Sequence, residues 1–142
     1  MPQIYNFEQV VNFGDVDSGG VVYHPRYLEY YERARIDVLK KINCPFDQMI
    51  RDGIFLVVAS ANITYRKPLV FGDVALVSSE VLQVSGKSVV VKQQIHTQLQ
   101  TENGMEQILC STVEIVLVCF DLKNRTSALL PEDMAQKFKD AL

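Results

Sequence analysis

Apolar and polar residues follow two different periods along this chain of 142 residues. Over residues 25–42, apolar side chains recur at spacings of three and four, which is the period of an amphipathic helix. Over residues 88–99 they recur at every second position, which is typical of a strand with one buried face. Pro25 suits a first helical turn, whereas Asn43 and Pro45 suit the end of a helix. The pattern therefore predicts one long helix at 25–42.

The rest of the apolar pattern is mostly strand-like and predicts an antiparallel sheet. Residues 54–65 are apolar on both faces in their first half, as expected for a central strand that is covered on both sides. Pro131 opens a short helix in which Met134 and Phe138 point inward. The other strands are expected at residues 4–13, 73–84, 88–99 and 107–120.

These elements occur in the order strand, long helix and four strands joined by hairpin-like turns. One helix across an antiparallel sheet is the simplest packing of such a set, so the predicted class is α+β. No linker, repeat or low-complexity tract divides the sequence, and a single domain is expected over residues 1–142. A sheet of this kind leaves an edge strand without a neighbour. Either edge-to-edge dimerisation or extra covering elements are therefore expected.

Composition narrows the class of protein further. Hydrophobic residues make up 48% of the chain and charged residues 22%, which is globular rather than disordered. The net charge of −3 gives no sign of a nucleic-acid binder or an anionic-membrane binder. No apolar run reaches the roughly 18–20 residues of a membrane helix. Since no signal peptide is recognisable either, a soluble cytoplasmic protein is expected.

The three cysteines, Cys44, Cys110 and Cys119, are odd in number and form no CxxC pair. Neither a disulfide framework nor a zinc site is predicted, and no other metal site is expected. Cys110 and Cys119 lie within apolar runs, so buried thiols in a reducing compartment are expected.

The residues with the clearest chemical potential lie between 13 and 35. Asp17 follows a predicted strand and precedes Ser18 and two glycines, and a helix begins a few residues later. The unpaired N–H groups of a helix N-terminus can polarise a carbonyl, and a nearby carboxylate can attack that carbonyl or activate a water. His24 lies at the helix entrance. The same pattern also suits turn or capping roles for Asp17 and His24, and spacing alone does not separate Asp15 from Asp17.

A run of residues in this segment carries a family signature: Asp15, Asp17, Gly19, Gly20, Val21, Val22, Tyr23, His24, Tyr27, Tyr31, Glu32, Arg33, Ala34 and Arg35. It resembles the signature of the 4-hydroxybenzoyl-CoA thioesterase family of hotdog proteins. The branch that it resembles in particular is the bacterial short-chain acyl-CoA thioesterase branch associated with the Tol-Pal system. The likeness continues at residues 53–58, at Tyr65 with Pro68, and at 118–131, and so covers nearly the whole chain.

The resemblance implies a hotdog fold, with a long helix packed on a curved antiparallel sheet, and a homodimer or homotetramer with active sites at the subunit interface. It implies hydrolysis of an acyl-CoA, with a short-chain aliphatic or aromatic acyl group, to the free acid and coenzyme A. Asp17 would be the nucleophile or general base, and the oxyanion donor would be the backbone N–H of His24 or Tyr23. The His24 side chain would help to position the thioester or water, and Asp15 would be structural. No cofactor is expected, because coenzyme A is part of the substrate.

Substrate-binding residues are expected at two places. The acyl group would enter between helix residues of one subunit and strand residues of its partner: Tyr27, Tyr31, Phe55, Val57 and Val58. The phosphates of coenzyme A would meet Arg66, Lys67, Lys87 and Ser88, although these are also plausible surface residues. With a net charge of −3, a phosphate-bearing ligand requires that such basic residues gather at the pocket mouth.

Other functions stay open at the level of the sequence. An acyl-CoA hydratase or dehydratase of the same fold resembles a motif with Asp and His closer together than the seven-residue gap between Asp17 and His24. A non-catalytic module that binds acyl-CoA or acyl-carrier protein would not need Asp17. In another hotdog thioesterase lineage the acid lies on the helix, where Glu32 is the candidate here. Acyl-carrier protein is also a possible thiol carrier for a hydrolase.

Overall fold

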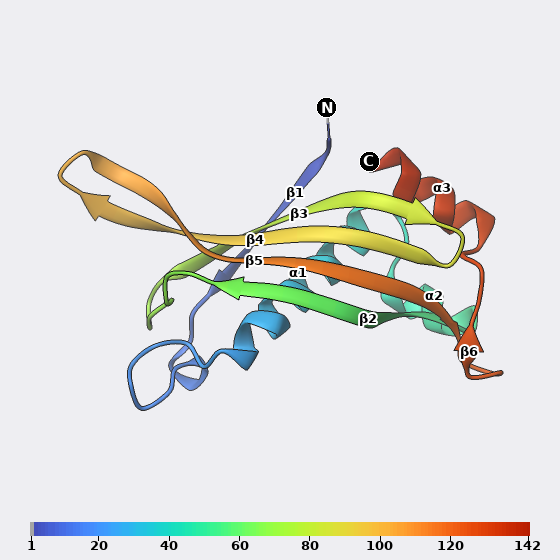
Figure 1. The fold of residues 1–142 in the computed structure, drawn as a ribbon, viewed down its shortest axis with the longest axis horizontal. Helices are drawn as coiled ribbons and strands as arrows, with labels where there is room; N and C mark the ends of the chain where they lie inside the picture. The colour runs from blue at the N-terminus through green and yellow to red at the C-terminus, as the bar shows by residue number, and fades with distance from the viewer. Residues whose placement is uncertain (1) are drawn as a thin grey trace.

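The computed structural model describes residues 2–142, which form a curved six-stranded antiparallel sheet with one long helix packed against a face of it (Figure 1). The helices are α1 (Pro25–Lys41), α2 (Phe46–Arg51) and α3 (Glu132–Asp140), with a 3-10 turn η1 (Phe13–Asp15). The strands are β1 (Ile4–Val10), β2 (Ile54–Tyr65), β3 (Val74–Ser85), β4 (Ser88–Thr101), β5 (Gly104–Asp121) and the short β6 (Thr126–Ser127). Their order across the sheet is β1-β3-β4-β5-β2, and β6 pairs with β5. The predicted α+β class and hotdog architecture are confirmed.

Helix α1 forms the centre of the core because its apolar stripe faces the sheet. Its buried residues include Tyr27, Tyr30, Tyr31 and Ala34, whose spacing follows the helical period. The helix ends where Asn43 takes a left-handed conformation with φ 61°. The sequence-based prediction of a helix at 25–42 is therefore correct to within one residue.

Strand β2 has the predicted bounds but not the predicted neighbours. It pairs with β5 on one side and lies at the edge of the sheet, so the expectation of a central strand is wrong for a single chain. Its residues 58–62 are exposed, and the Val58 side chain keeps 49% of its surface. An apolar pattern on both faces indicates that both faces of a strand are buried, but it does not identify which strands pair with its edges. The long free edge of β2 is consequently the least protected part of the sheet.

Three local features depart from the expected elements. The first strand stops at Val10, and a capping box between Asn12 and Asp15 starts the η1 turn, where the strand had been expected to continue. Helix α2 has only six residues, which is too short to show a helical period. The β4–β5 hairpin is longer than predicted, with Thr101 opposite Gly104, and it projects beyond the other strands (left in Figure 1).

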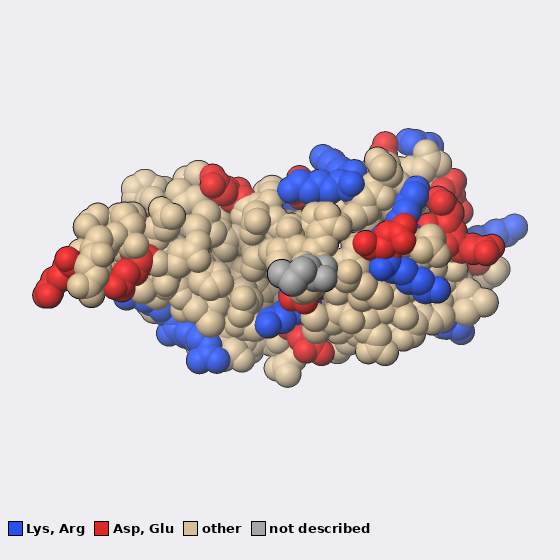
Figure 2. Space-filling view, turned by 90° about the horizontal axis from the view of Figure 1, so that it is seen from above, with Lys and Arg blue, Asp and Glu red and all other residues tan. Residues whose placement is uncertain are grey.

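Charges and apolar segments of the fold follow simple patterns. On the face shown in Figure 2, basic and acidic side chains lie close to one another and form no large patch of a single sign. No helix within residues 2–142 has both the length and the apolar character needed to span a bilayer.

Candidate active site

The Asp17 loop is a tight turn between η1 and α1. The Gly19 N–H donates to Asp17 Oδ1 at 2.8 Å, and the Gly20 N–H donates to the Asp17 carbonyl at 3.0 Å. Gly20 has a φ of 85°, which disfavours any residue with a Cβ, and a Cβ on Gly19 would lie 3.2 Å from Asp17 Oδ1. The two glycines therefore hold one carboxylate oxygen in place. The second oxygen, Oδ2, accepts no hydrogen bond from residues 2–142 and lies on an exposed residue.

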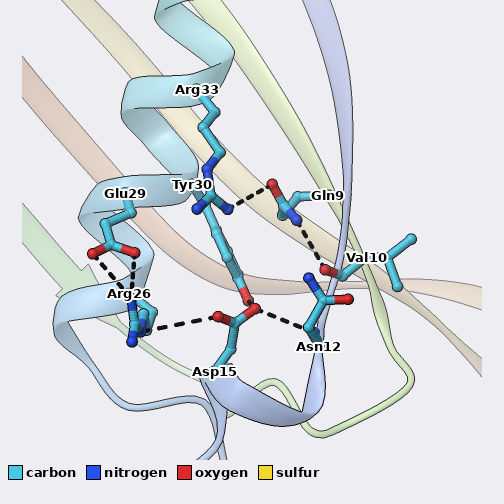
Figure 3. Close-up of polar contacts among 8 residues, drawn as sticks. All are labelled: Gln9, Val10, Asn12, Asp15, Arg26, Glu29, Tyr30 and Arg33. Carbon is cyan, nitrogen blue, oxygen red and sulfur yellow. Dashed lines mark hydrogen bonds and ion pairs between the residues drawn. The ribbon is translucent and has the colours of Figure 1, made fainter.

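Asp15 has a different environment although it is only two residues away. Its Oδ2 accepts hydrogen bonds from the Tyr30 hydroxyl at 2.7 Å and the Asn12 N–H at 3.2 Å, and Arg26 Nε lies 3.9 Å from Oδ1 (Figure 3). The Asp15 side chain is 12% exposed. These contacts tie η1 to helix α1. The structure thus separates two acids that sequence spacing could not separate.

The start of α1 offers one free backbone donor. The Tyr23 N–H donates to the Asp15 carbonyl at 2.9 Å, so it is not available to a substrate. The His24 N–H meets no acceptor within residues 2–142, and Pro25 has no N–H. Of the two predicted oxyanion donors, only the His24 N–H is unoccupied. The Tyr23 N–H is already bonded to Asp15, so the prediction of Tyr23 as a donor is corrected.

Tyr65 packs against this helix start from the end of β2. Its hydroxyl donates to the His24 carbonyl at 3.3 Å, and its ring lies edge-on to the His24 imidazole with 6.1 Å between centroids. A second edge-on contact joins Tyr65 to Tyr27 at 5.1 Å. In the sequence, Tyr65 is singled out only by its match to the family pattern. Its contacts show that the end of β2 and the start of α1 form one unit.

Tyr27 and Tyr31 are core residues in a single chain. They are 3% and 0% exposed, and the Tyr27 hydroxyl accepts the Leu69 N–H at 3.0 Å. Burial raises the pKa of both phenols. In a single chain α1 turns these side chains toward the sheet, and their place in an acyl pocket between two subunits stays a prediction.

An apolar cavity of about 320 Å³ lies between α1, α2, α3 and the sheet. Three of its lining residues are the predicted acyl-binding residues Phe55, Val57 and Val58. Glu32, which the sequence offers as an alternative acid, and Arg35 also line it. The apolar lining residues were not predicted as pocket residues, because their character is the same as that of any core position: Ile36, Leu39, Met49, Val81, Val91, Leu117 and Phe138.

The cavity and the Asp17 loop lie apart within one chain. The cavity residue nearest the start of α1 is Glu32, which is seven residues beyond Pro25 and about 10 Å further along the helix axis. Asp17, Tyr23 and His24 are not among the lining residues. A single chain therefore holds Asp17 and His24 on the same connection between η1 and α1, away from the predicted acyl-binding strand.

The four predicted phosphate-binding residues also fall into two groups. Arg66 and Lys67 are exposed just beyond β2, whereas Lys87 and Ser88 lie at the β3–β4 turn. The Cys119 N–H donates to the Lys87 carbonyl, and Cys119 is paired with Leu56, so Lys87 is level with the first residues of β2. Arg66 is ten residues further along β2, roughly 33 Å in an extended strand. Within one chain the antiparallel strands place these turns at opposite ends, and the gathering of the four residues at the mouth of a shared pocket stays a prediction.

Other nucleophiles and ligand sets give no competing site. The three cysteines are free and buried, and burial raises the pKa of Cys110 to about 11, so its thiol is protonated at neutral pH. No group of three His, Cys, Asp or Glu side chains suited to a metal ion occurs among residues 2–142. The groups that the described site offers for chemistry are a carboxylate and a backbone N–H.

Comparison with known proteins agrees with this geometry. Residues 11–138 match the family described as the thioesterase-like superfamily. The chain belongs to this superfamily. The chain is similar to the acyl-CoA thioester hydrolase YbgC of Escherichia coli O6:H1, which is 30% identical over 129 residues, covering 91% of each chain. The long-chain acyl-CoA thioesterase FadM of Escherichia coli K12 is 34% identical over 118 residues, covering 83% of this chain and 84% of FadM.

A solved structure from the family confirms the fold over its whole length. The probable thioesterase YbaW from Escherichia coli superposes with a TM-score of 0.78 and 29% identity, covering 96% of this chain and 98% of that one. The motif between Asp15 and Arg35 lies inside the region that matches the family.

Proposed function

We propose that this protein hydrolyses the thioester bond of an acyl-CoA, with Asp17 as the catalytic carboxylate and the His24 N–H as the oxyanion donor. The observation that carries the proposal is that the connection between η1 and α1 holds both a free carboxylate oxygen, on a loop held by Gly19 and Gly20, and the one unoccupied N–H at the start of α1. Relatives named as acyl-CoA thioester hydrolases support it.

The proposed reaction requires no metal and no cofactor. The thioester carbonyl oxygen accepts a hydrogen bond from the His24 N–H, which stabilises the negative charge that develops on that oxygen. Asp17 either attacks the carbonyl carbon, forming an anhydride that water then cleaves, or removes a proton from a water that attacks directly. In both routes the carbon–sulfur bond breaks, the thiolate of coenzyme A leaves and takes up a proton, and the acyl group departs as a carboxylic acid.

We propose that each active site is shared between two copies of the chain. The free edge of β2 can pair with a second β2 in the antiparallel direction, which places the first residues of one strand beside the last residues of the other. Tyr65 and His24 lie together at the last residues, and Phe55, Val57 and Val58 line the cavity near the first. Pairing would therefore bring the cavity of one subunit beside Asp17 of its partner, in a homodimer or in a homotetramer of two such dimers.

The same pairing gives the basic residues a common role. Arg66 and Lys67 lie at the last residues of β2, and Lys87 and Ser88 lie level with the first. Two paired subunits would bring Lys87 of the partner subunit toward Arg66, where the phosphates of coenzyme A could bind. Acyl-carrier protein, which carries the same pantetheine thiol, is the alternative donor of the acyl group.

The first test is the substitution Asp17→Asn with a panel of acyl-CoAs and a thiol reagent. The amide keeps the hydrogen bond from Gly19 but is neither a base nor a nucleophile, so turnover should fall by about 100-fold or more. Asp37→Asn, on the polar side of α1, is the matched control and should retain full turnover. Full activity of Asp17→Asn would refute the assignment. Binding of acyl-CoA without thiol release by the unmodified protein would favour a non-catalytic binding module.

Mixed subunits test the shared site. Val57→Trp should block the cavity and Asp17→Asn should remove the carboxylate, so each variant alone should be inactive. When the two are unfolded and refolded together, a mixed dimer contains one open cavity facing one intact Asp17 and should recover turnover. If each site belonged to a single chain, the mixture would stay inactive. An inactive mixture would refute the shared site but not the assignment of Asp17 as the catalytic carboxylate.

We further propose a cytoplasmic location and a place in the Tol-Pal-associated branch of the 4-hydroxybenzoyl-CoA thioesterase family. Three free cysteines agree with a reducing compartment. The branch rests on the resemblance of the segment between Asp15 and Arg35. Fractionation of cells that express the protein tests the location.

A further inference from the structure

The cavity is elongated across the sheet. Its lining residues come from the five long strands in turn: Val57 and Val58 on β2, Leu117 on β5, Val91 on β4, Val81 on β3 and Tyr5 on β1. Direct pairing joins Val58 to Leu117 and Val91 to Val81. Four interstrand spacings separate β2 from β1, which gives a length of up to about 19 Å. The space is thus a channel under α1 that begins at the free edge of β2.

The walls of this channel are mainly aliphatic and aromatic. Ile36 and Leu39 of α1, Met49 of α2 and Phe138 of α3 cover it opposite the sheet. Phe46 and Phe55 form an edge-on pair, with 5.0 Å between centroids, in the wall between α2 and β2. Such a surface favours a ligand that hides methylene groups from water.

Three charged residues line the channel, Glu32, Arg35 and Glu80, of which Arg35 has a hydrogen-bond partner and Glu80 is partly exposed. Arg35 Nη1 donates to Gln93 Oε1 at 3.0 Å, and the Gln93 amide donates to the Tyr31 carbonyl and to Ser79 Oγ at 3.0 and 2.9 Å. Glu32, by contrast, is an exposed residue. Because these buried polar groups already bind one another, a ligand needs no polar group at the end of its chain to satisfy them.

We propose that the channel selects substrates with an unbranched aliphatic acyl chain of medium length, and that Val81 on β3 sets the limit on chain length. This inference rests on the proposed function. A volume of about 320 Å³ holds about ten groups of roughly 30 Å³ each, the share of one water-sized group. Each methylene that enters leaves water, so kcat/KM should rise about fourfold per carbon, and the rise should stop at about ten carbons.

The test measures kcat/KM for straight-chain acyl-CoAs from two to sixteen carbons, and for benzoyl-CoA, with the unmodified protein and two variants. Phe has about four more side-chain carbons than Val, and Ala has about two fewer, so Val81→Phe should shorten the limiting length by about four carbons and Val81→Ala should lengthen it by about two. Val84→Phe is the matched control, since Val84 lies on the same strand, partly buried, and is not among the lining residues. Its profile should equal that of the unmodified protein.

The outcomes separate the inference from the function on which it rests. Hydrolysis with no dependence on chain length, with benzoyl-CoA preferred over straight chains of equal carbon number, or with one limit in all variants would overturn the channel. If nothing is hydrolysed, the proposed function fails. The affinity of the unmodified and Val81 proteins for the same acyl-CoAs, measured by calorimetry, then decides the inference, because the limit should appear in binding and shift in the same directions. Val81→Ala keeps the test valid if Val81→Phe does not fold.

Discussion

At the scale of single residues, the site depends on the neighbours of two acids that are two positions apart. Asp15 receives the Tyr30 hydroxyl and the Asn12 N–H, and so joins the segment after β1 to helix α1. Asp17 receives only the Gly19 N–H from its own loop and keeps an oxygen for chemistry. One acid is used in folding and the other is left available, and hydrogen-bond partners alone make the difference.

The Tyr30→Phe substitution tests the folding role of Asp15. Removing the hydroxyl leaves the partly buried carboxylate without its shortest hydrogen bond, so the free energy of unfolding in urea should fall by about 1.5–3 kcal/mol. Tyr23→Phe is the control, since Tyr23 is 52% exposed and its hydroxyl donates no hydrogen bond within residues 2–142. Equal stability of both variants would contradict the role given to Asp15.

At the scale of elements, both ends of α1 are held by contacts with other parts of the chain. Tyr65 fixes the beginning through the His24 carbonyl. Asn43 ends the helix in a left-handed conformation, and its carbonyl accepts a hydrogen bond from Lys137 Nζ at 2.9 Å. This contact links the end of α1 to α3. The position of α3, which covers one side of the cavity, therefore depends on the end of α1.

Substitutions at Asn43 test this helix end. Asn43→Val should lower the free energy of unfolding by about 1–2 kcal/mol, because a β-branched residue is disfavoured at positive φ. Asn43→Gly should be neutral or slightly stabilising, since glycine adopts this conformation without steric cost. Both variants keep the carbonyl that Lys137 binds, so the comparison isolates the backbone term. Chemical denaturation measures it, and equal losses in both variants would refute the explanation.

At the scale of the whole molecule, the free edge of β2 and the separation of Asp17 from the cavity point to the same conclusion. One chain supplies each part of the site, but at different ends of β2. Two chains paired through β2 would supply complete sites. The length of β2, twelve residues, exceeds what an uncovered edge strand usually has in a stable monomer.

Substitution at the centre of β2 tests the pairing. Ser60 is exposed close to the middle of the strand, where a two-fold axis would bring two copies together. Ser60→Asp should favour monomers, because like charges would face each other across the two-fold axis. Ser60→Asn introduces a side chain of the same shape as Asp without the charge, and it should keep the assembly. Light scattering should give a mass of two or four times 16.1 kDa for Ser60→Asn and the unmodified protein. An active monomer of the unmodified protein would overturn the shared site.

Local patterns in the sequence predicted much of this fold. The bounds of α1 and β2 were predicted from helical and strand periods, and the tight turn after Asp17 was predicted from its two glycines. The family signature between Asp15 and Arg35 pointed to Asp17 and His24. Helix α2 was missed because six residues carry no period, and the place of β2 was mistaken because an apolar pattern does not identify a neighbour.

The sequence by itself determined which segments are helix and strand, because these depend on local periodicity, and it determined which residues are able to do chemistry. Only the tertiary structure decided which acid is free, which N–H is unoccupied and where the cavity lies. Asp15 differs from Asp17 through Tyr30, fifteen residues away, and the cavity joins Phe55 to Phe138. Contacts between residues far apart in the chain are set by packing and hydrogen-bond satisfaction, and no local pattern carries them.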